Sequence, residues 1–307
     1  MFDILILIIG FILVSFVSGN NLPACSGTII ASKMVSKKNG VLLTIAGYVL
    51  GLVLEGKFLK QVSTLLPGAG FQNQYLFTFI LFAIAALIFF FANRQKVPQS
   101  LSIIFTSSII GMDIALNIKI PLYFLIKLIG FWIIAPLVSL IFSLILIRAF
   151  YKKRSKNIFS ALKTLKFLSV LFAFLTAFTL GANTIGLILV SMPYYNYSII
   201  VLILGIIFGS IFLNKNSLKR ISSEIVSLKY LNSVVSQAAS FIFVEVATLF
   251  SIPLSNTQIF VTSLYGTAFG YRQRLLVKKT MFSIMSSWIL LIAVSIASSF
   301  VIISIIH

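Results

Sequence analysis

The sequence contains few of the side chains on which most enzymes and metal sites depend. Its one histidine is the last residue, His307, and its one cysteine is Cys25. These counts exclude an internal disulfide framework and a cysteine-based metal cluster, and they argue against histidine-dependent catalysis. Only five acidic residues occur in 307, and no two are close in the sequence. We therefore expect no enzyme, no catalytic residue and no metal ligand set.

Charge of either sign is also scarce, since charged residues make up 9% of the chain and hydrophobic residues 60%, with a mean hydropathy of +1.12. An average soluble protein is about one quarter charged, so this composition predicts a multi-pass protein of the cell membrane, in contact with lipid. The net charge of +19 comes from basic residues that lie between apolar runs. They form no continuous face for nucleic acid and instead suit cytoplasmic loops.

Apolar runs of about twenty residues, the length that crosses a bilayer, recur along the chain. The predicted spans are 2–17 with a continuation to 35, 40–56, 73–93, 128–148, 164–180, 196–213, 234–251 and 280–304. The strongest basic cluster separates two sets of spans. We expect a first transmembrane repeat at 1–147, a basic cytoplasmic linker at 148–166 and a second transmembrane repeat at 167–307. The basic segment 272–279 is also expected in the cytoplasm, with both termini on the other side.

Small polar residues interrupt two of these runs at a depth where a helix should continue. The first interruption is 18–28 and the second is 181–186, each roughly fifteen residues after its span begins. Inside a membrane, backbone that stops being helical must be buried in protein or line a wet cavity. Transporters build such cavities from paired broken helices. We therefore predict a broken helix in each half.

A second pair of elements indicates an internal duplication. The pattern Pro-x-Ser-x-(Ser/Thr) occurs at 98–102 and again at 253–257, in short segments that suit re-entrant hairpins. The repeat distance is 155 residues between the two prolines and 163 residues between Asn20 and Asn183. We predict an all-α polytopic membrane protein with two inverted-topology repeats, broken helices and re-entrant hairpins.

At these residues the chain resembles the inorganic phosphate transporter (PiT) family, whose halves each carry a Gly-Ala-Asn-Asp-x-Ala-Asn signature and a later Pro-x-Ser-Thr-Thr-His element. Asn20 and Asn183 match the first asparagine of the signature, whereas Asn21 and Thr184 replace its aspartates. Tyr48 stands where the family has a glutamate. The resemblance implies a divergent member of a phosphate transporter family.

The later family element is also kept in part. Its serine is present as Ser100 and Ser255 and its second threonine as Ser102 and Thr257. The histidine that ends the element is replaced in both copies, by Ile103 and by Gln258.

An oxyanion is bound well where helix N-termini converge, because free N–H groups and the positive end of the helix dipole face it. A hydroxyl residue just after a proline suits the first turn of a helix, so these side chains can face one anion. The predicted substrate-binding residues are Asn20, Ser100, Ser102, Asn183, Ser255, Asn256, Thr257 and Gln258.

A coupling cation, sodium or a proton, is the only cofactor expected. Its predicted ligands are Asn20, Asn21, Asn183, Thr184 and Glu245. Sodium favours a carboxylate among its ligands, so the missing aspartates weaken the case for sodium. Glu245 lies in a long stretch that is otherwise uncharged, and an acid inside a membrane is a functional candidate. The structural alternative is that Glu245 pairs with a basic side chain of another helix.

The predicted function is a secondary transporter for inorganic phosphate. A permease for sulfate or another tetrahedral oxyanion is the close alternative, because N–H and hydroxyl donors read only shape and charge. A transport-inactive membrane sensor or assembly subunit is the third. Beyond phosphate and lipid, the partner considered is a second copy of the chain in a homodimer.

Overall fold

The computed structural model describes residues 2–59, 74–95, 99–120, 122–152, 158–192, 195–213, 230–270 and 277–306. Across these residues the secondary structure is helical and contains no strand. Eight helices are long and apolar enough to cross a membrane. The expectation of an all-α, multi-pass membrane protein is therefore confirmed.

The two halves contain similar but not identical series of elements. The first half contains α1 (Phe2–Ala31), α2 (Lys37–Glu55), the 3-10 turn η1 (Gly56–Leu59), α4 (Gln74–Gln95), α5 (Leu101–Ala115) and α6 (Leu122–Lys152). The second half contains α7 (Ile158–Leu180), the π-helical turn η2 (Gly181–Ile185), α8 (Gly186–Ser191), α9 (Tyr195–Phe208), the π-helical turn η3 (Gly209–Leu213), α11 (Tyr230–Leu249), α12 (Asn256–Gly270) and α13 (Val277–Ile306).

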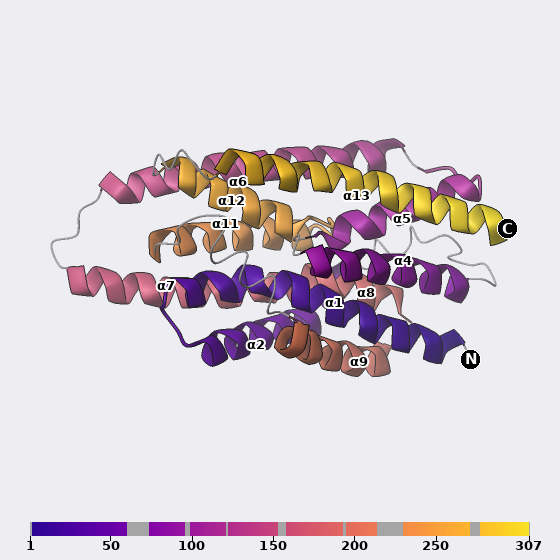
Figure 1. Cartoon of the computed structure of the whole chain (residues 1–307), viewed down its shortest axis with the longest axis horizontal. Coiled ribbons are helices and arrows are strands. Elements are labelled where there is room, and N and C mark those ends of the chain that lie inside the picture. The colour runs from indigo at the N-terminus through magenta and orange to yellow at the C-terminus, as the bar shows by residue number, and fades with distance from the viewer. Residues whose placement is uncertain are drawn as a thin grey trace.

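Helices at matching places in the two halves run in opposite directions, as α1 and α7 do and as α6 and α13 do (Figure 1). Helices α4 and α5, called hairpin 1 below, lie in the half of the molecule that holds both termini, and α11 and α12, called hairpin 2, lie in the other half. The tips of the two hairpins meet near the middle. This arrangement is the one that inverted repeats would produce, and the repeat relation itself stays a prediction.

The end of α6, the start of α7, the end of α12 and the start of α13 lie at the end of the molecule opposite the two termini (Figure 1). These helix ends flank the two basic segments that are predicted to share one side of the membrane, and that topology stays a prediction. The assignment of that side to the cytoplasm rests on the basic residues.

The two halves are interleaved and are not separate packing units. The short arm α5 packs mainly on α13, and α12 packs mainly on α6. Likewise α2 packs on α7, while α9 and η3 pack on α1. Each half therefore supplies the partners of the other, and the predicted repeats 1–147 and 167–307 share one core.

Two glycines bring the interleaved helices into backbone contact. A Cβ atom on Gly51 of α2 would lie 1.8 Å from the carbonyl oxygen of Phe178, and one on Gly209 would lie 2.0 Å from that of Ser15. Ser15 and Phe178 are 163 residues apart, the distance that also separates Asn20 from Asn183. Small residues of this kind allow close helix crossings in membranes.

The first predicted broken helix is wrong. Helix α1 continues from Phe2 to Ala31 through the polar residues 18–28, with Pro23 inside it. Hydroxyl groups in this helix bond to carbonyl oxygens four residues earlier, as Ser15 Oγ does at 2.7 Å and Ser26 Oγ at 3.3 Å, so small polar residues do not interrupt the helix. The second predicted break is a change of winding: 181–185 form a π-helical turn, a feature common at functional sites.

The segment between α6 and α7 is shorter than the predicted linker 148–166. Helix α6 extends to Lys152 and α7 begins at Ile158, so most of 148–166 is helical, and 153–157 lie outside the described residues. Pro98, residues 271–276 and Glu224 also lie outside them.

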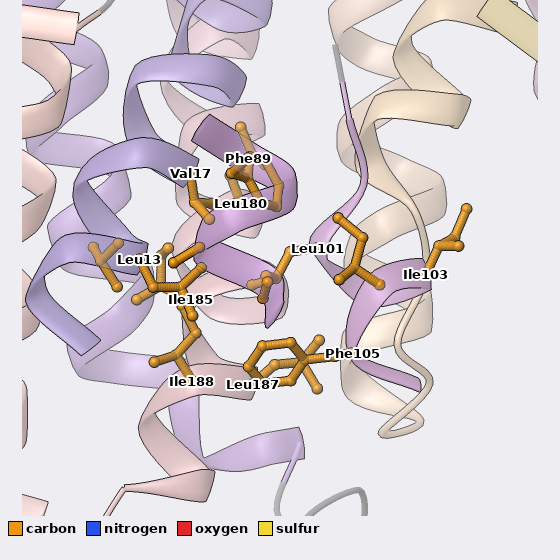
Figure 2. Close-up of a cluster of buried hydrophobic side chains, with 14 of the residues drawn as sticks. Leu13, Val17, Phe89, Leu101, Ile103, Phe105, Leu180, Ile185, Leu187 and Ile188 are labelled. Atoms are coloured by element: carbon orange, nitrogen blue, oxygen red, sulfur yellow. The ribbon is translucent and has the colours of Figure 1, made fainter. Parts of the chain in front are cut away.

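An apolar cluster fills the interior beside hairpin 1 (Figure 2). Its side chains come from α1, α4, α5, α7, η2 and α8, and they include Leu13, Val17, Phe89, Leu101, Ile103, Phe105, Leu180, Ile185, Leu187 and Ile188. Each of these side chains is 2% exposed or less.

Candidate functional site

The tips of the two hairpins are joined by a reciprocal pair of hydrogen bonds. Ser102 Oγ at the start of α5 donates to the carbonyl oxygen of Leu254, at 3.1 Å. Thr257 Oγ1 at the start of α12 donates to the carbonyl oxygen of Gln99, at 2.9 Å. Donors and acceptors are each 155 residues apart, so the two bonds are equivalent. Both hydroxyls were predicted to face the substrate, and here they hold the tips together.

The serine that precedes each short helix is explained by capping. Ser100 Oγ accepts from the backbone N–H of Ile103 at 3.4 Å, and Ser255 Oγ accepts from that of Gln258 at 3.2 Å. An N-cap serine stabilises a helix in this way. Each hydroxyl proton remains available to a ligand, because the capping bond uses only the oxygen.

The two N-termini also present backbone donors. The N–H groups in the first turn of a helix have no acceptor within that helix, which at these tips concerns Leu101, Ser102, Asn256 and Thr257. The positive ends of the α5 and α12 dipoles therefore meet near the middle of the molecule. This is the chemistry of an anion site.

Asn20 of α1 clamps the first tip. Its Nδ2 donates to Asn93 Oδ1 at 2.7 Å, and its Oδ1 accepts from the backbone N–H of Gln99 at 2.9 Å. Asn93 in turn donates from Nδ2 to the carbonyl oxygen of Phe16 at 3.1 Å. These bonds connect α1 to the end of α4 and to the tip beyond it.

Asn183, in the π-helical turn, clamps the second tip in the same manner. Its Nδ2 donates to Thr248 Oγ1 at 2.9 Å and to the carbonyl oxygen of Ile252 at 3.2 Å. Thr248 lies 155 residues after Asn93, so the repeat distance could have revealed both of these partners. Sequence reasoning missed them, because neither residue belongs to a motif.

Hairpin 2 also carries an oriented amide with a free donor. Asn256 Oδ1 accepts from Ser240 Oγ at 2.8 Å, whereas Asn256 Nδ2 has no hydrogen-bond partner. Gln258 Oε1 and Gln99 Oε1 are also buried and unpaired. A buried polar group without a partner is costly, so these atoms are available to bond a ligand or water.

The tips are free of charged side chains. The sequence has none from 99 to 112 or from 246 to 271. No group of three or more histidine, cysteine, aspartate or glutamate residues that could hold a metal occurs in the part of the chain that the structure describes. The tips themselves therefore offer an anion neutral donors and helix dipoles.

Comparison with known proteins identifies the fold and the family. The family described as "Phosphate transporter family" matches residues 17–299. The chain belongs to the phosphate transporter family. A protein of Methanocaldococcus jannaschii named "Putative phosphate permease" is 26% identical over 262 residues, which cover 85% of this chain and 83% of the relative. The solved structure titled "The sodium-dependent phosphate transporter" aligns with a TM-score of 0.87 at 13% identity, covering 99% of this chain and 98% of that one.

The residues at the signature aspartates of the phosphate transporter family are neutral here and buried. Asn21 is 4% exposed and Thr184 is 3% exposed. Asn21 Oδ1 has no hydrogen-bond partner. Among the predicted cation ligands, Asn20 and Asn183 instead use their side chains to clamp the hairpins, although Asn183 Oδ1 is unpaired.

Glu245, the fifth predicted cation ligand, is not at the tips. Its carboxyl interacts with the Glu55 carboxyl at the end of α2. The Oε2 atoms of both residues are buried and have no hydrogen-bond partner. Two neighbouring carboxylates repel each other unless a proton or a cation lies between them. The sequence analysis did not identify this pair, because 190 residues separate its members.

A cavity of about 420 Å³ lies between α6 and α11. It is lined mainly by apolar side chains, with Lys127 as its charged residue. Such a lining offers an oxyanion few donors, so the cavity is not the candidate site of this transporter family member.

Proposed function

We propose that the protein is a secondary transporter that moves inorganic phosphate across the cell membrane and binds it at the hairpin tips. The observation that carries this proposal is the meeting of two capped helix N-termini, α5 and α12, with neutral donors and no carboxylate. Family membership supports phosphate as the substrate. The related permease and the sodium-dependent transporter, by their names, support it further.

Uptake of labelled phosphate into proteoliposomes tests the proposal. Phosphate should accumulate when a cation gradient is imposed, and unlabelled phosphate should compete better than sulfate. Stronger competition by sulfate would favour the sulfate permease. Absence of both uptake and counterflow of either anion would favour a transport-inactive sensor or assembly subunit.

The capping serines give a sharper prediction. Ser255→Ala, and equally Ser100→Ala, should weaken phosphate uptake, because each removes a donor to a charged ligand, worth about 1.5–3 kcal/mol, or about tenfold or more in affinity. Alanine also removes the cap, at about 1 kcal/mol. The apparent affinity for phosphate in proteoliposomes measures the effect.

Two further variants at position 255 separate capping from binding. Ser255→Thr keeps both the cap and the hydroxyl, so it should retain uptake. Ser255→Asp keeps the cap but places a negative charge at the site, so it should abolish uptake. If Ser255→Asp transports normally, the anion does not bind at this tip.

We also propose that the coupling cation is a proton held by the Glu55–Glu245 pair. The neutral side chains Asn21 and Thr184 offset a desolvated sodium ion less than two carboxylates would. The pair of carboxyls, by contrast, needs a positive charge or a proton between its members.

This proposal predicts that uptake follows an imposed pH gradient and changes little when sodium is replaced by choline. Glu245→Gln should remove the response to the pH gradient, whereas Glu245→Asp should keep part of it. Asp3→Asn, which removes an acid elsewhere, should leave the response unchanged. A steep, saturable rise of uptake with sodium at fixed pH would contradict proton coupling.

A further inference from the structure

The two hairpins occupy equivalent positions, but their buried faces differ in polarity. Residues of α4 and α11 that are 155 apart are buried in both hairpins. The buried face of α4 carries Phe77, Leu81, Phe82 and Ala85, and the matching positions of α11 are Asn232, Ser236, Gln237 and Ser240. The same exchange continues at the start of the second arms, where Leu101 and Ile103 are matched by Asn256 and Gln258.

The polar face of hairpin 2 is not fully satisfied by protein. Both polar atoms of the Asn232 amide, Ser233 Oγ and Gln237 Oε1 lack hydrogen-bond partners, although all three side chains are 0% exposed. An unpaired buried amide costs about 1–3 kcal/mol, so such groups normally hold water or a ligand. An amide that joined two helices would use its atoms for that contact, which Asn232 does not.

These side chains form a continuous series, called the polar track here. It starts at Asn232 near the beginning of α11 and continues through Ser233, Ser236, Gln237 and Ser240. Ser240 Oγ then donates to Asn256 Oδ1 at the tip. The track therefore runs from the candidate anion site toward the side of the molecule on which α11 begins, α6 ends and α7 begins, called the basic end here (Figure 1).

Three neighbouring helices enclose the track. Gln237 Nε2 donates to the carbonyl oxygen of Ala24 at 3.0 Å and to Thr28 Oγ1 at 2.8 Å, both on α1. Thr176 Oγ1 of α7 donates to the backbone oxygen of Gln237 at 2.9 Å. Ser263 Oγ of α12 donates to that of Ser236 at 3.2 Å. The surroundings of the track thus add further polar groups.

The corresponding space beside hairpin 1 is filled by the apolar cluster (Figure 2). The rings of Phe82 and Phe105 stack there with centroids 5.7 Å apart. Phe82 occupies the position that matches Gln237. Close-packed apolar side chains leave no room or partners for water, so this side of the tips is dry.

We infer that the polar track is the hydrated half of the path by which an inorganic oxyanion moves between the hairpin tips and the basic end, and that the apolar cluster closes the other half. The inference rests on the proposed transport function. The unpaired amide nitrogens of Asn232 and Asn256 are the donors that the anion oxygens meet along it. The exposed lysines near the start of α7, Lys163 and Lys166, raise the local anion concentration at the basic end.

Cysteine accessibility tests this inference. On a Cys25→Ser background, Ser233→Cys and Ser236→Cys should react with an impermeant methanethiosulfonate that carries a sulfonate. Reaction should occur in vesicles of the orientation in which Phe159→Cys, an exposed residue at the basic end, also reacts. Phosphate should slow labelling at Ser236→Cys several-fold. The matched hairpin 1 variants, Thr78→Cys and Leu81→Cys, should react from neither side.

The outcomes separate the two proposals. If sulfate slows the labelling of the track and phosphate does not, the anion path is supported and phosphate is rejected as the substrate. Unreactive cysteines at 233 and 236, with Phe159→Cys labelled, would overturn the inference whatever the substrate. Equal labelling of Leu81→Cys and Ser236→Cys would overturn the division into a hydrated and a closed half. Labelling requires only folded protein, so it remains informative for variants that do not transport.

Discussion

Replacing Ser102 with alanine and Thr257 with valine in one protein is expected to abolish phosphate uptake while the spans remain folded. The two changes remove both hydrogen bonds between the hairpin tips and leave the carbonyl oxygens of Leu254 and Gln99 buried without donors. Each such loss costs about 1–3 kcal/mol, and the tips then lose the alignment on which the anion site depends. A fall in uptake of about 100-fold or more corresponds to the combined cost.

The control for this experiment exchanges the two residues. Ser102→Thr combined with Thr257→Ser keeps a hydroxyl at each position, so uptake should be retained. The single variants Ser102→Ala and Thr257→Val should each have an intermediate effect and should be non-additive, since both bonds join the same pair of tips. Normal uptake by the double alanine–valine variant would show that the reciprocal bonds are not needed for transport.

Gly51→Ala is expected to have the largest effect on stability. The added Cβ would lie 1.8 Å from a backbone oxygen of α7, so α2 and α7 must separate. Gly181→Ala should act at the same crossing, because its Cβ would lie 1.9 Å from the carbonyl oxygen of Tyr48. Overpacking of this kind typically costs about 1–3 kcal/mol of stability. Because the contact here is with rigid backbone, we expect the loss of stability to reach or exceed the upper end of that range.

Gly130→Ala provides the matched control, since its Cβ would meet nothing within 4 Å. Thermal unfolding in detergent, monitored by size-exclusion chromatography, should show a lower melting temperature for the Gly51→Ala and Gly181→Ala variants. The melting temperature of Gly130→Ala should not change. Equal melting temperatures for Gly51→Ala and Gly130→Ala would mean that the helices do not cross as closely as described.

Much of this fold follows from patterns that are local in the sequence. Apolar run length predicts the spans, and the pairing of a proline with a later serine predicts the starts of α5 and α12. The repeat distance of 155 residues also predicts that the two short helices are equivalent. The amino-acid sequence alone is therefore enough to predict that a substrate site lies at 98–102 and 253–257.

What the sequence did not reveal depends on long-range packing. Helix α1 continues through 18–28 because its polar side chains find partners that composition does not show: Ser26 and Thr28 bond back to their own helix, and Asn20 bonds to Asn93 and to the backbone of Gln99. The pairing of Glu55 with Glu245 depends on how α2 and α11 meet. Asn20 and Asn183 were predicted to bind the substrate and the coupling cation. In the structure they bond to Asn93 and Thr248, which are contributed by other helices.

The interleaving of the halves has a consequence for the order in which the protein assembles. The arm α5 has only 15 residues, too few to cross a bilayer, and its main partner, α13, begins 162 residues after α5 ends. Until α13 has been inserted, hairpin 1 lacks the surface that buries it, so the first half must wait in the membrane for the second. The anion site is therefore completed only after α13 has been translated, and its formation depends on contacts between distant parts of the chain.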